Sequence, residues 1–127
     1  MHPHTRALIA ASACAVITGQ KVAGLYDHTA REHLCIAAEC RGTRLQGHDE
    51  ARAATFGGTL PDLYDNADRA FISLSVNGTR ATGHDHGSNS AYVADVTDRV
   101  IQLYDYSQNA WFAFEAQRAE DGAAAND

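Results

Sequence analysis

Cysteine, proline and long apolar runs are scarce in this sequence. Its 127 residues include three cysteines and two prolines. An odd number of thiols without zinc-type spacing predicts neither a disulfide framework nor a structural zinc site, so we expect Cys14, Cys35 and Cys40 to be reduced and the protein to be cytoplasmic. The longest apolar stretch, residues 7–17, falls well short of the roughly twenty residues that cross a bilayer, so no transmembrane helix is expected.

Positive charge is also scarce. Ten Lys and Arg stand against sixteen Asp and Glu, which gives a formal net charge of −6 at pH 7. The basic residues are scattered along the chain, whereas proteins that bind a phosphate backbone or an anionic membrane cluster them on one surface. We therefore expect neither nucleic acid nor a membrane surface as a partner.

What the sequence has instead is a repeated triplet of residues. Leu-Tyr-Asp occurs at 25–27, 63–65 and 103–105, and Gly-His-Asp occurs between these copies at 47–49 and 83–85. Self-similarity at a regular spacing is typical of folds built from one repeated supersecondary unit. Each of these triplets closes an extended segment and precedes a polar stretch, a pattern that predicts a strand followed by a loop.

A second β-rich run follows each loop. Residues 72–76 alternate between apolar and polar side chains, which is typical of a half-buried strand, and Asn77-Gly78 then predicts a two-residue type I′ turn. Strand, loop, strand and turn, repeated, predict an all-β antiparallel meander of about ten strands, closed as a small barrel or a two-sheet sandwich. We expect a single domain over residues 1–117 and a disordered tail over 118–127.

The first twenty residues allow two interpretations. Ile9–Cys14 leads through Gly19 into the first Leu-Tyr-Asp much as Ile36–Cys40 leads through Gly42 into the first Gly-His-Asp, so residues 1–20 are predicted to be an additional half-repeat. The alternative is a signal peptide, because Arg6 precedes the apolar stretch and small residues follow it. In that case the protein would be secreted.

Register divides each triplet between the two faces of the sheet, because residues two apart in a strand share a face. The Asp lies on the apolar face, which should face the core. That face also carries Leu25, Leu63, Leu103, Ala23, Leu45, Ala81 and Ile101. An Asp at the start of a loop usually accepts hydrogen bonds from backbone amides two residues on, so we expect these carboxylates to be structural.

The Tyr or His of each triplet lies on the opposite, polar face. Exposed rings beside Arg and Gln suit stacking on a sugar or on a protein surface. The same rings also suit β-strands simply by covering their neighbours, which leaves a structural role open. The residues predicted to bind a ligand on this face are Tyr26, His48, Tyr64, His84, Tyr104, Arg44 and Arg80.

One local cluster suggests a metal. His84 and His86 alternate on one strand and can reach one ion. With Gly78 upstream, their spacing resembles the first half of the cupin metal motif, which implies a divalent metal and a metal-dependent enzyme; the Glu expected next in that motif is replaced at Ser90. A third ligand would be His48 or Asp49.

We therefore predict a non-catalytic domain that uses no cofactor and binds a small molecule, a sugar or a protein through its Tyr/His face or its loops. A homo-oligomer formed through an edge strand is possible on the same grounds. Repetition supplies equivalent residues, whereas an active site needs a unique asymmetric group. The alternative hypothesis is the metal-binding protein or enzyme that uses His84, His86 and His48.

Overall fold

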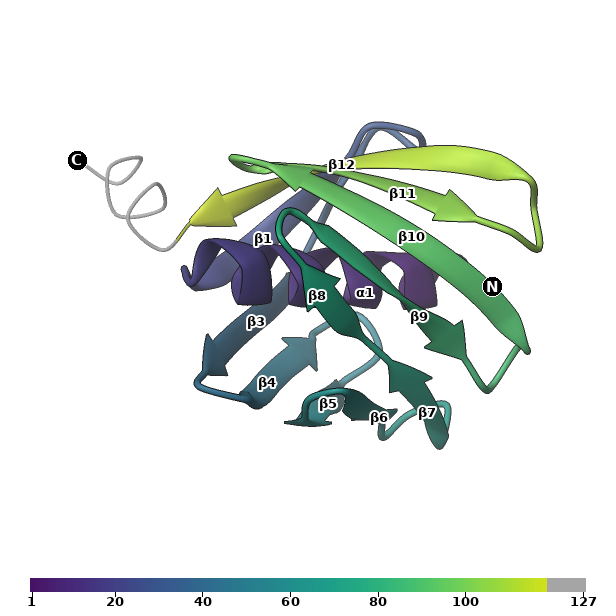
Figure 1. The fold of residues 1–127 in the computed structure, drawn as a ribbon. Helices are drawn as coiled ribbons and strands as arrows, with labels where there is room; N and C mark the ends of the chain where they lie inside the picture. Colours follow the sequence, from purple (N-terminus) through teal and green to yellow (C-terminus); the bar gives the residue numbers. More distant parts are fainter. Residues whose placement is uncertain (119–127) are drawn as a thin grey trace.

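The computed structural model describes residues 1–118, which form one helix followed by twelve strands (Figure 1). The elements are α1 (Pro3–Thr18), β1 (Val22–Asp27), β2 (Glu32–Leu34), β3 (Ile36–Arg41), β4 (Arg44–Asp49), β5 (Ala54–Thr59), β6 (Asp62–Asp65), β7 (Ala70–Ser73), β8 (Ser75–Asn77), β9 (Arg80–Asp85), β10 (Ser90–Thr97), β11 (Val100–Asp105) and β12 (Ala110–Arg118). The predicted tail over 118–127 lies outside the described residues except for Arg118, which ends β12.

Ten of the strands form a closed antiparallel barrel. Their order is β10-β11-β12-β1-β3-β4-β5-β6-β7-β9, and β9 pairs with β10 to close the ring. The predicted all-β fold of about ten antiparallel strands is confirmed, and of its two forms the barrel is the correct one. Closure removes the exposed edges that a meander of this length would otherwise present.

The two remaining strands continue barrel strands past a break. β2 pairs with β1 and is separated from β3 by Cys35, while β8 pairs with β9 and is separated from β7 by Leu74. The strand predicted over residues 72–76 is therefore two short strands. The alternation of its side chains does not reveal that its first half pairs with β6 and its second half with β9.

The N-terminal segment corrects the sequence prediction. Residues 3–18 form the helix α1 and not a β half-repeat; the signal-peptide alternative stays a prediction. Pro3 stands in the first turn, where its missing N–H costs nothing, and Gly19 ends the helix with φ of 69° while its N–H bonds the carbonyl of Ala15. Alanine, the best helix former, makes up much of the segment between them.

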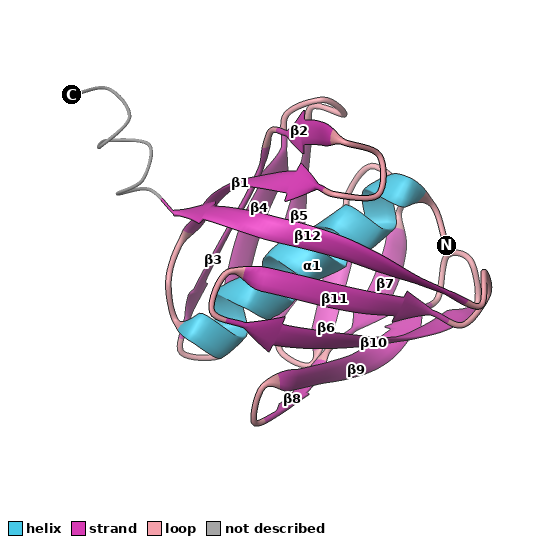
Figure 2. Cartoon of the chain, turned by 90° about the horizontal axis from the view of Figure 1, so that it is seen from above, coloured by secondary structure: helices cyan, strands magenta, loops and turns pink. Residues whose placement is uncertain are grey.

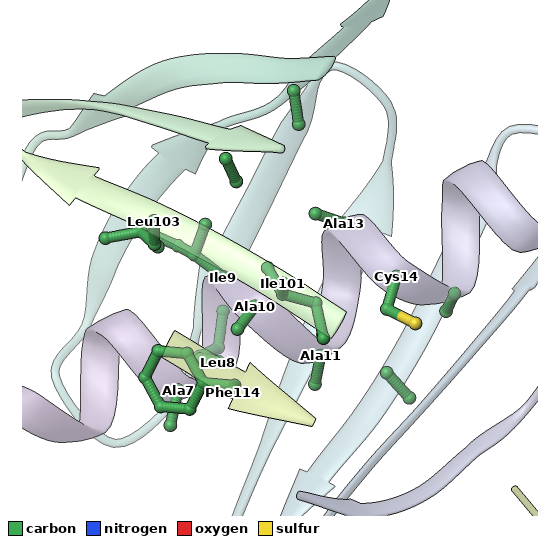
Figure 3. Packing of buried hydrophobic residues seen from close by; sticks show 14 of the residues in the cluster. Ala7, Leu8, Ile9, Ala10, Ala11, Ala13, Cys14, Ile101, Leu103 and Phe114 are labelled. Atoms are coloured by element: carbon green, nitrogen blue, oxygen red, sulfur yellow. The ribbon is translucent and has the colours of Figure 1, made fainter. Parts of the chain in front are cut away.

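Helix α1 fills the barrel. Residues 7–15 are all buried, so no polar face exists and no helical periodicity appears in the sequence. The helix contacts strands on several sides, namely β1, β3, β4, β8, β10, β11 and β12. Figure 2 shows α1 enclosed by the strands, and Figure 3 shows Ile101, Leu103 and Phe114 packed beside it. The inner faces of the strands bury their apolar residues against this helix.

The inward residues of the triplets behave as register predicts, with one exception. Leu25, Leu45, Leu63, Ala81, Ile101 and Leu103 are each 0% exposed. Ala23 is exposed instead, because the register of β1 against β12 shifts between Val22 and Gly24. Such an irregularity turns the residue at the break to the other face.

Glycine replaces leucine in two triplets because an aromatic ring fills the same space. Gly47 pairs with Phe56 across β4 and β5, and Gly83 pairs with Tyr92 across β9 and β10. A Cβ added to Gly47 would overlap the Phe56 ring, and one added to Gly83 would overlap the carbonyl oxygen of Ser73. The Tyr92 hydroxyl donates to that carbonyl at 2.7 Å, and burial raises the pKa of Tyr92 well above its ordinary value.

We predict that Gly83→Ala lowers the free energy of unfolding by about 3 kcal/mol, because the new methyl group must displace backbone rather than a side chain. The matched control is Gly24→Ala, whose Cβ would come too close to the Oε1 atom of Gln117 at 2.8 Å, the end of a flexible side chain, while the nearest backbone atom, the carbonyl oxygen of Leu34, lies at an ordinary contact distance of 3.6 Å. We expect a loss below about 1 kcal/mol there. Urea unfolding of both variants measures the difference, and equal losses would contradict the close approach at Gly83.

The tight turns lie one residue later than predicted. In the β8–β9 connection Asn77 pairs with Arg80, so the two central residues are Gly78 and Thr79. Gly78 has φ of 64°, whereas Asn77 and Thr79 are not among the residues with positive φ. Positive φ at the first central position alone is the pattern of a type II′ turn, which also joins the two strands with the correct twist.

No helix within residues 1–118 is long and apolar enough to cross a membrane.

Candidate functional site

One end of the barrel carries the Asp of every triplet. The strands that carry the triplets run in the same direction, so their Asp residues all lie at this end: Asp27, Asp49, Asp65, Asp85 and Asp105. The first turn of α1 lies there too, because Arg6 contacts Asp105 and His4 contacts Asp68 in the loop after β6. We call this end the acidic rim.

The Asp residues fix the loops that follow them, as the sequence predicts. At four of the five positions the carboxylate accepts a hydrogen bond from the backbone N–H two residues on: Asp27, Asp65, Asp85 and Asp105. The fourth residue after each triplet has positive φ and starts the return of the chain: Arg31, Ala53, Arg69, Asn89 and Asn109. The carboxylates at these four positions therefore have a structural role, which is to hold the loops that follow them.

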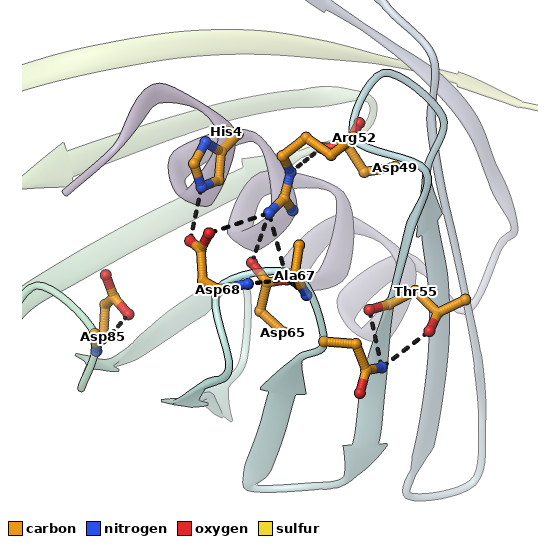
Figure 4. A network of polar contacts seen from close by, with 10 residues as sticks. His4, Asp49, Arg52, Thr55, Asp65, Ala67, Asp68 and Asp85 are labelled. Atoms are coloured by element: carbon orange, nitrogen blue, oxygen red, sulfur yellow. Dashed lines mark hydrogen bonds and ion pairs between the residues drawn. The ribbon is translucent and has the colours of Figure 1, made fainter.

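Asp49 differs because it binds a side chain. Arg52 Nε donates to Asp49 Oδ2 at 2.7 Å, and Arg52 Nη1 donates to Asp65 Oδ2 at 3.0 Å and lies 3.6 Å from Asp68 Oδ1 (Figure 4). Burial acts to lower the pKa of Arg52, but the hydrogen bonds and charges of Asp49 and Asp65 outweigh it and raise the pKa. One guanidinium therefore holds three carboxylates together.

Helix α1 is tied to the same end through two side chains. His4 Nε2 lies 2.7 Å from Asp68 Oδ2, and Arg6 Nη1 donates to Asp105 Oδ2 at 3.4 Å while its guanidinium lies 3.8 Å from the centre of the Phe112 ring. Burial acts to raise the pKa of Asp105, but hydrogen bonds from Ser107, the charge of the N-terminal ammonium and a hydrogen bond from Arg6 outweigh it, so this pKa lies below its ordinary value.

Three side chains of the rim come within metal-binding distance of one another. Their possible ligand atoms, from His4, Asp65 and Asp68, all lie within 4.8 Å. Arg52 Nη1 lies beside both carboxylates and already supplies the positive charge that an ion would bring. The group is an ion-pair network.

A pocket of about 680 Å³ opens at the acidic rim between three parts of the chain. The first turns of α1 supply Pro3, His4 and Ala7, and the loop after β4 supplies Glu50–Arg52. The opposite wall consists of β2 with its flanking residues, from Glu32 to Ile36, together with Asp27. Most of the surface of the pocket is apolar, and Ile36 and Ala7 are only 2% and 3% exposed.

The ligand-binding residues predicted from the sequence lie elsewhere, on the outer wall. Arg44, His48 and Arg80 are exposed, and the half-buried rings are Tyr26, Tyr64, His84 and Tyr104. Their strands alternate with others around the closed barrel, so the structure does not bring the seven residues into one surface. Arg80 is held by Asp95, with Nε and Oδ1 2.8 Å apart.

The rings instead form separate clusters with neighbours on adjacent strands and in the loops that follow their own strands. Tyr104 packs edge-on against Tyr106 and Trp111, with ring centres 4.8 and 5.1 Å apart. Tyr106 and Trp111 are 52% and 56% exposed. We call these three residues the aromatic patch. The other clusters are Tyr26 with His28 and His33, and Tyr64 with Phe71.

The predicted metal ligands do not converge. His84 and His86 pack edge-on with ring centres 4.9 Å apart, and His84 Nε2 lies 2.9 Å from Asn89 Oδ1. His48 is on β4, which β5, β6 and β7 separate from β9. In residues 1–118 the structure brings no third ligand to the His84/His86 pair.

Sequence reasoning missed two groups of residues. The outer rings of the aromatic patch had a signal, since Tyr106 and Trp111 stand two and seven positions after Tyr104, where strand alternation and the return strand place them beside it. No signal in the sequence indicated the pocket, because its walls come from a helix, a loop and a short strand that only the fold brings together.

No protein-family model, curated protein or solved structure matches the chain. The function is therefore inferred from the geometry of the chain's own residues.

Proposed function

We propose that the protein is a non-catalytic domain that binds another protein through the aromatic patch. The observation that carries the proposal is the exposure of two large rings beside a third: Tyr106, directly after β11, and Trp111, on β12, are each more than half exposed. Trp and Tyr are the residues most enriched among those that dominate binding energy at protein interfaces. Exposed apolar clusters of this kind are typical of interaction surfaces.

The neighbours of the patch support a broad contact surface. Tyr104 pairs with Val93 on β10 and with Trp111 on β12, so the rings continue onto a half-buried apolar residue. Gln102, next on the same outer face of β11, is exposed and offers hydrogen-bonding groups. An apolar centre with a polar border is the usual arrangement of a protein interface.

A protein fits this patch better than a sugar does. The rings of Tyr106 and Trp111 are tilted by 77° and 64° against Tyr104, so the three rings form an uneven surface. A sugar stacks on one flat exposed face, whereas a protein surface supplies side chains that fit between tilted rings.

Two further arguments support a binding rather than a catalytic role. The carboxylates of the five triplets are engaged with loop amides or with Arg52, so they are poorly placed to exchange protons with a substrate. The odd number of cysteines keeps a cytoplasmic location as part of the proposal.

The test uses a photoreactive p-benzoylphenylalanine at Trp111 in an extract of the source cells, followed by binding measurements with the purified cross-linked protein. We expect one dominant partner, and we expect Trp111→Ala to weaken its binding about thirtyfold, in line with a loss of about 2 kcal/mol for an interface hot spot.

The matched control is Phe71, which is 55% exposed on β7 outside the aromatic patch. The probe at Phe71 should not cross-link the partner, and Phe71→Ala should leave its affinity unchanged. Equal cross-linking from both sites, or a glycan that binds and is lost in Trp111→Ala, would contradict the proposal. Both alanine variants should melt within a few degrees of the original protein because the rings are exposed.

A further inference from the structure

We propose that the pocket at the acidic rim is a binding site for a small organic cation, an amine with an apolar body. The site is separate from the aromatic patch, because no residue of the patch lines it. It is formed where α1, the loop after β4 and the short strand β2 meet, at the open end of the barrel.

The size and the lining of the pocket suit a small molecule. Its volume of about 680 Å³ falls within the range of about 300–1,000 Å³ typical of ligand sites, which also occur preferentially in the mouths of β-barrels. The apolar wall is built by Ala7 on α1, by Leu34 on β2 and by Ile36 on β3. A hydrocarbon body placed against these residues would gain free energy by leaving water.

The charged residues around the apolar wall favour a positively charged ligand. Asp27, Glu32 and Glu50 line the pocket. The side chains of Glu32 and Glu50 are exposed and form no hydrogen bond or ion pair with any residue in the described part of the chain. An ammonium group positioned between these carboxylates would be attracted by the charges of Glu32 and Glu50, which form no ion pair within residues 1–118.

Arg52 does not reverse this preference. Among the described residues it is the one arginine that lines the pocket, but its guanidinium is shared among Asp49, Asp65 and Asp68. Its Nη2 atom is buried without a hydrogen-bond partner in the described chain and can still donate to a neutral oxygen. An anion would meet a surplus of carboxylates, so a carboxylic acid of the same shape is disfavoured.

The test compares three probes that share one apolar body and differ in charge: 2-phenylethylammonium, 2-phenylethanol and 3-phenylpropanoate. We expect the ammonium to bind saturably with Kd below about 1 mM, the alcohol about tenfold more weakly, and the carboxylate without saturation. Calorimetry or chemical-shift titration of the full chain measures the affinities. Alkylation provides a second readout, because Cys35 lines the pocket and Cys40 does not.

Bound ammonium should slow alkylation of Cys35 and leave Cys40 unchanged. Replacing both acids by Glu32→Gln and Glu50→Gln should weaken the ammonium about tenfold and leave the alcohol unaffected. The control is Glu39→Gln, an acid on β3 that does not line this pocket.

The proposal is overturned if 2-phenylethylammonium does not saturate by about 10 mM. It is also overturned if the alcohol or the carboxylate binds as tightly as the ammonium, or if the double Gln variant binds the ammonium unchanged. Trp111→Ala should leave this binding intact, so the pocket and the aromatic patch are tested independently.

Discussion

Ala10→Asp is expected to unfold the protein. Ala10 is 0% exposed on a helix that the strands enclose, so the carboxylate would have neither water nor a partner cation. An unpaired buried charge costs several kcal/mol, a large part of the 5–15 kcal/mol that stabilises a typical domain. Circular dichroism and thermal melting measure the loss. The control Ala23→Asp makes the same change at an exposed position of β1 and should remain folded.

A less disruptive substitution measures how much the packing of α1 contributes to the free energy of unfolding. Leu8 is 0% exposed and faces the inner sides of the strands, so Leu8→Ala should lower the free energy of unfolding by about 3 kcal/mol while the protein stays folded. A loss below about 0.5 kcal/mol, or a folded Ala10→Asp protein with unchanged melting, would show that α1 does not lie inside the barrel.

Arg52→Met is expected to be the most destabilising charge change at the acidic rim. It removes the cation from Asp49, Asp65 and Asp68, and the side chain of Asp65 is only 1% exposed. Leaving buried carboxylates without their partner costs about 3 kcal/mol. Arg80→Met is the control, because the Arg80–Asp95 pair has a similar distance of 2.8 Å but lies on the surface, where such pairs contribute less than about 1 kcal/mol.

The loss in Arg52→Met should depend on pH. Burial acts to raise the pKa of Asp68, but the hydrogen bond from His4 and the charges of His4 and Arg52 lower it below its ordinary value. Stabilisation by such a carboxylate is present above its unfolded pKa of about 3.9 and is lost as the pH falls through the lower folded value. The difference in the free energy of unfolding between the original protein and Arg52→Met should therefore become smaller from pH 7 to pH 3. A constant difference would show that the variant acts through packing alone.

Helix α1 links the stability of the barrel to both proposed binding sites, the pocket at the acidic rim and the aromatic patch. The buried part of α1 fills the interior, while its first turn places His4 and Ala7 at the pocket and Arg6 against Asp105. Asp105 belongs to the triplet that also carries Tyr104 of the aromatic patch. Changes in the interior should therefore alter both proposed sites, which is why their tests use residues at the surface.

Features that depend on neighbouring residues could be predicted from the sequence. Alternation with period two assigned the inward leucines and the outward rings, and the position of Asp at the start of each loop predicted its hydrogen bonds to the turn amides. Together these patterns predicted an antiparallel all-β protein. They are local because the pleat of a strand and the reach of a short side chain extend over only a few residues.

The contents of the barrel and the arrangement of its open end depend on long-range contacts and could not be predicted from local patterns. Helix α1 is apolar on every side because strands surround it, and burial on every side erases the periodicity that identifies a helix in a sequence. Closure of the sheet, and not any local pattern, brought Arg52 to three carboxylates and opened a pocket between α1, β2 and the loop after β4. Contacts between residues far apart in the chain leave no local pattern in the sequence, so the pocket could be found only once the barrel had closed around its helix.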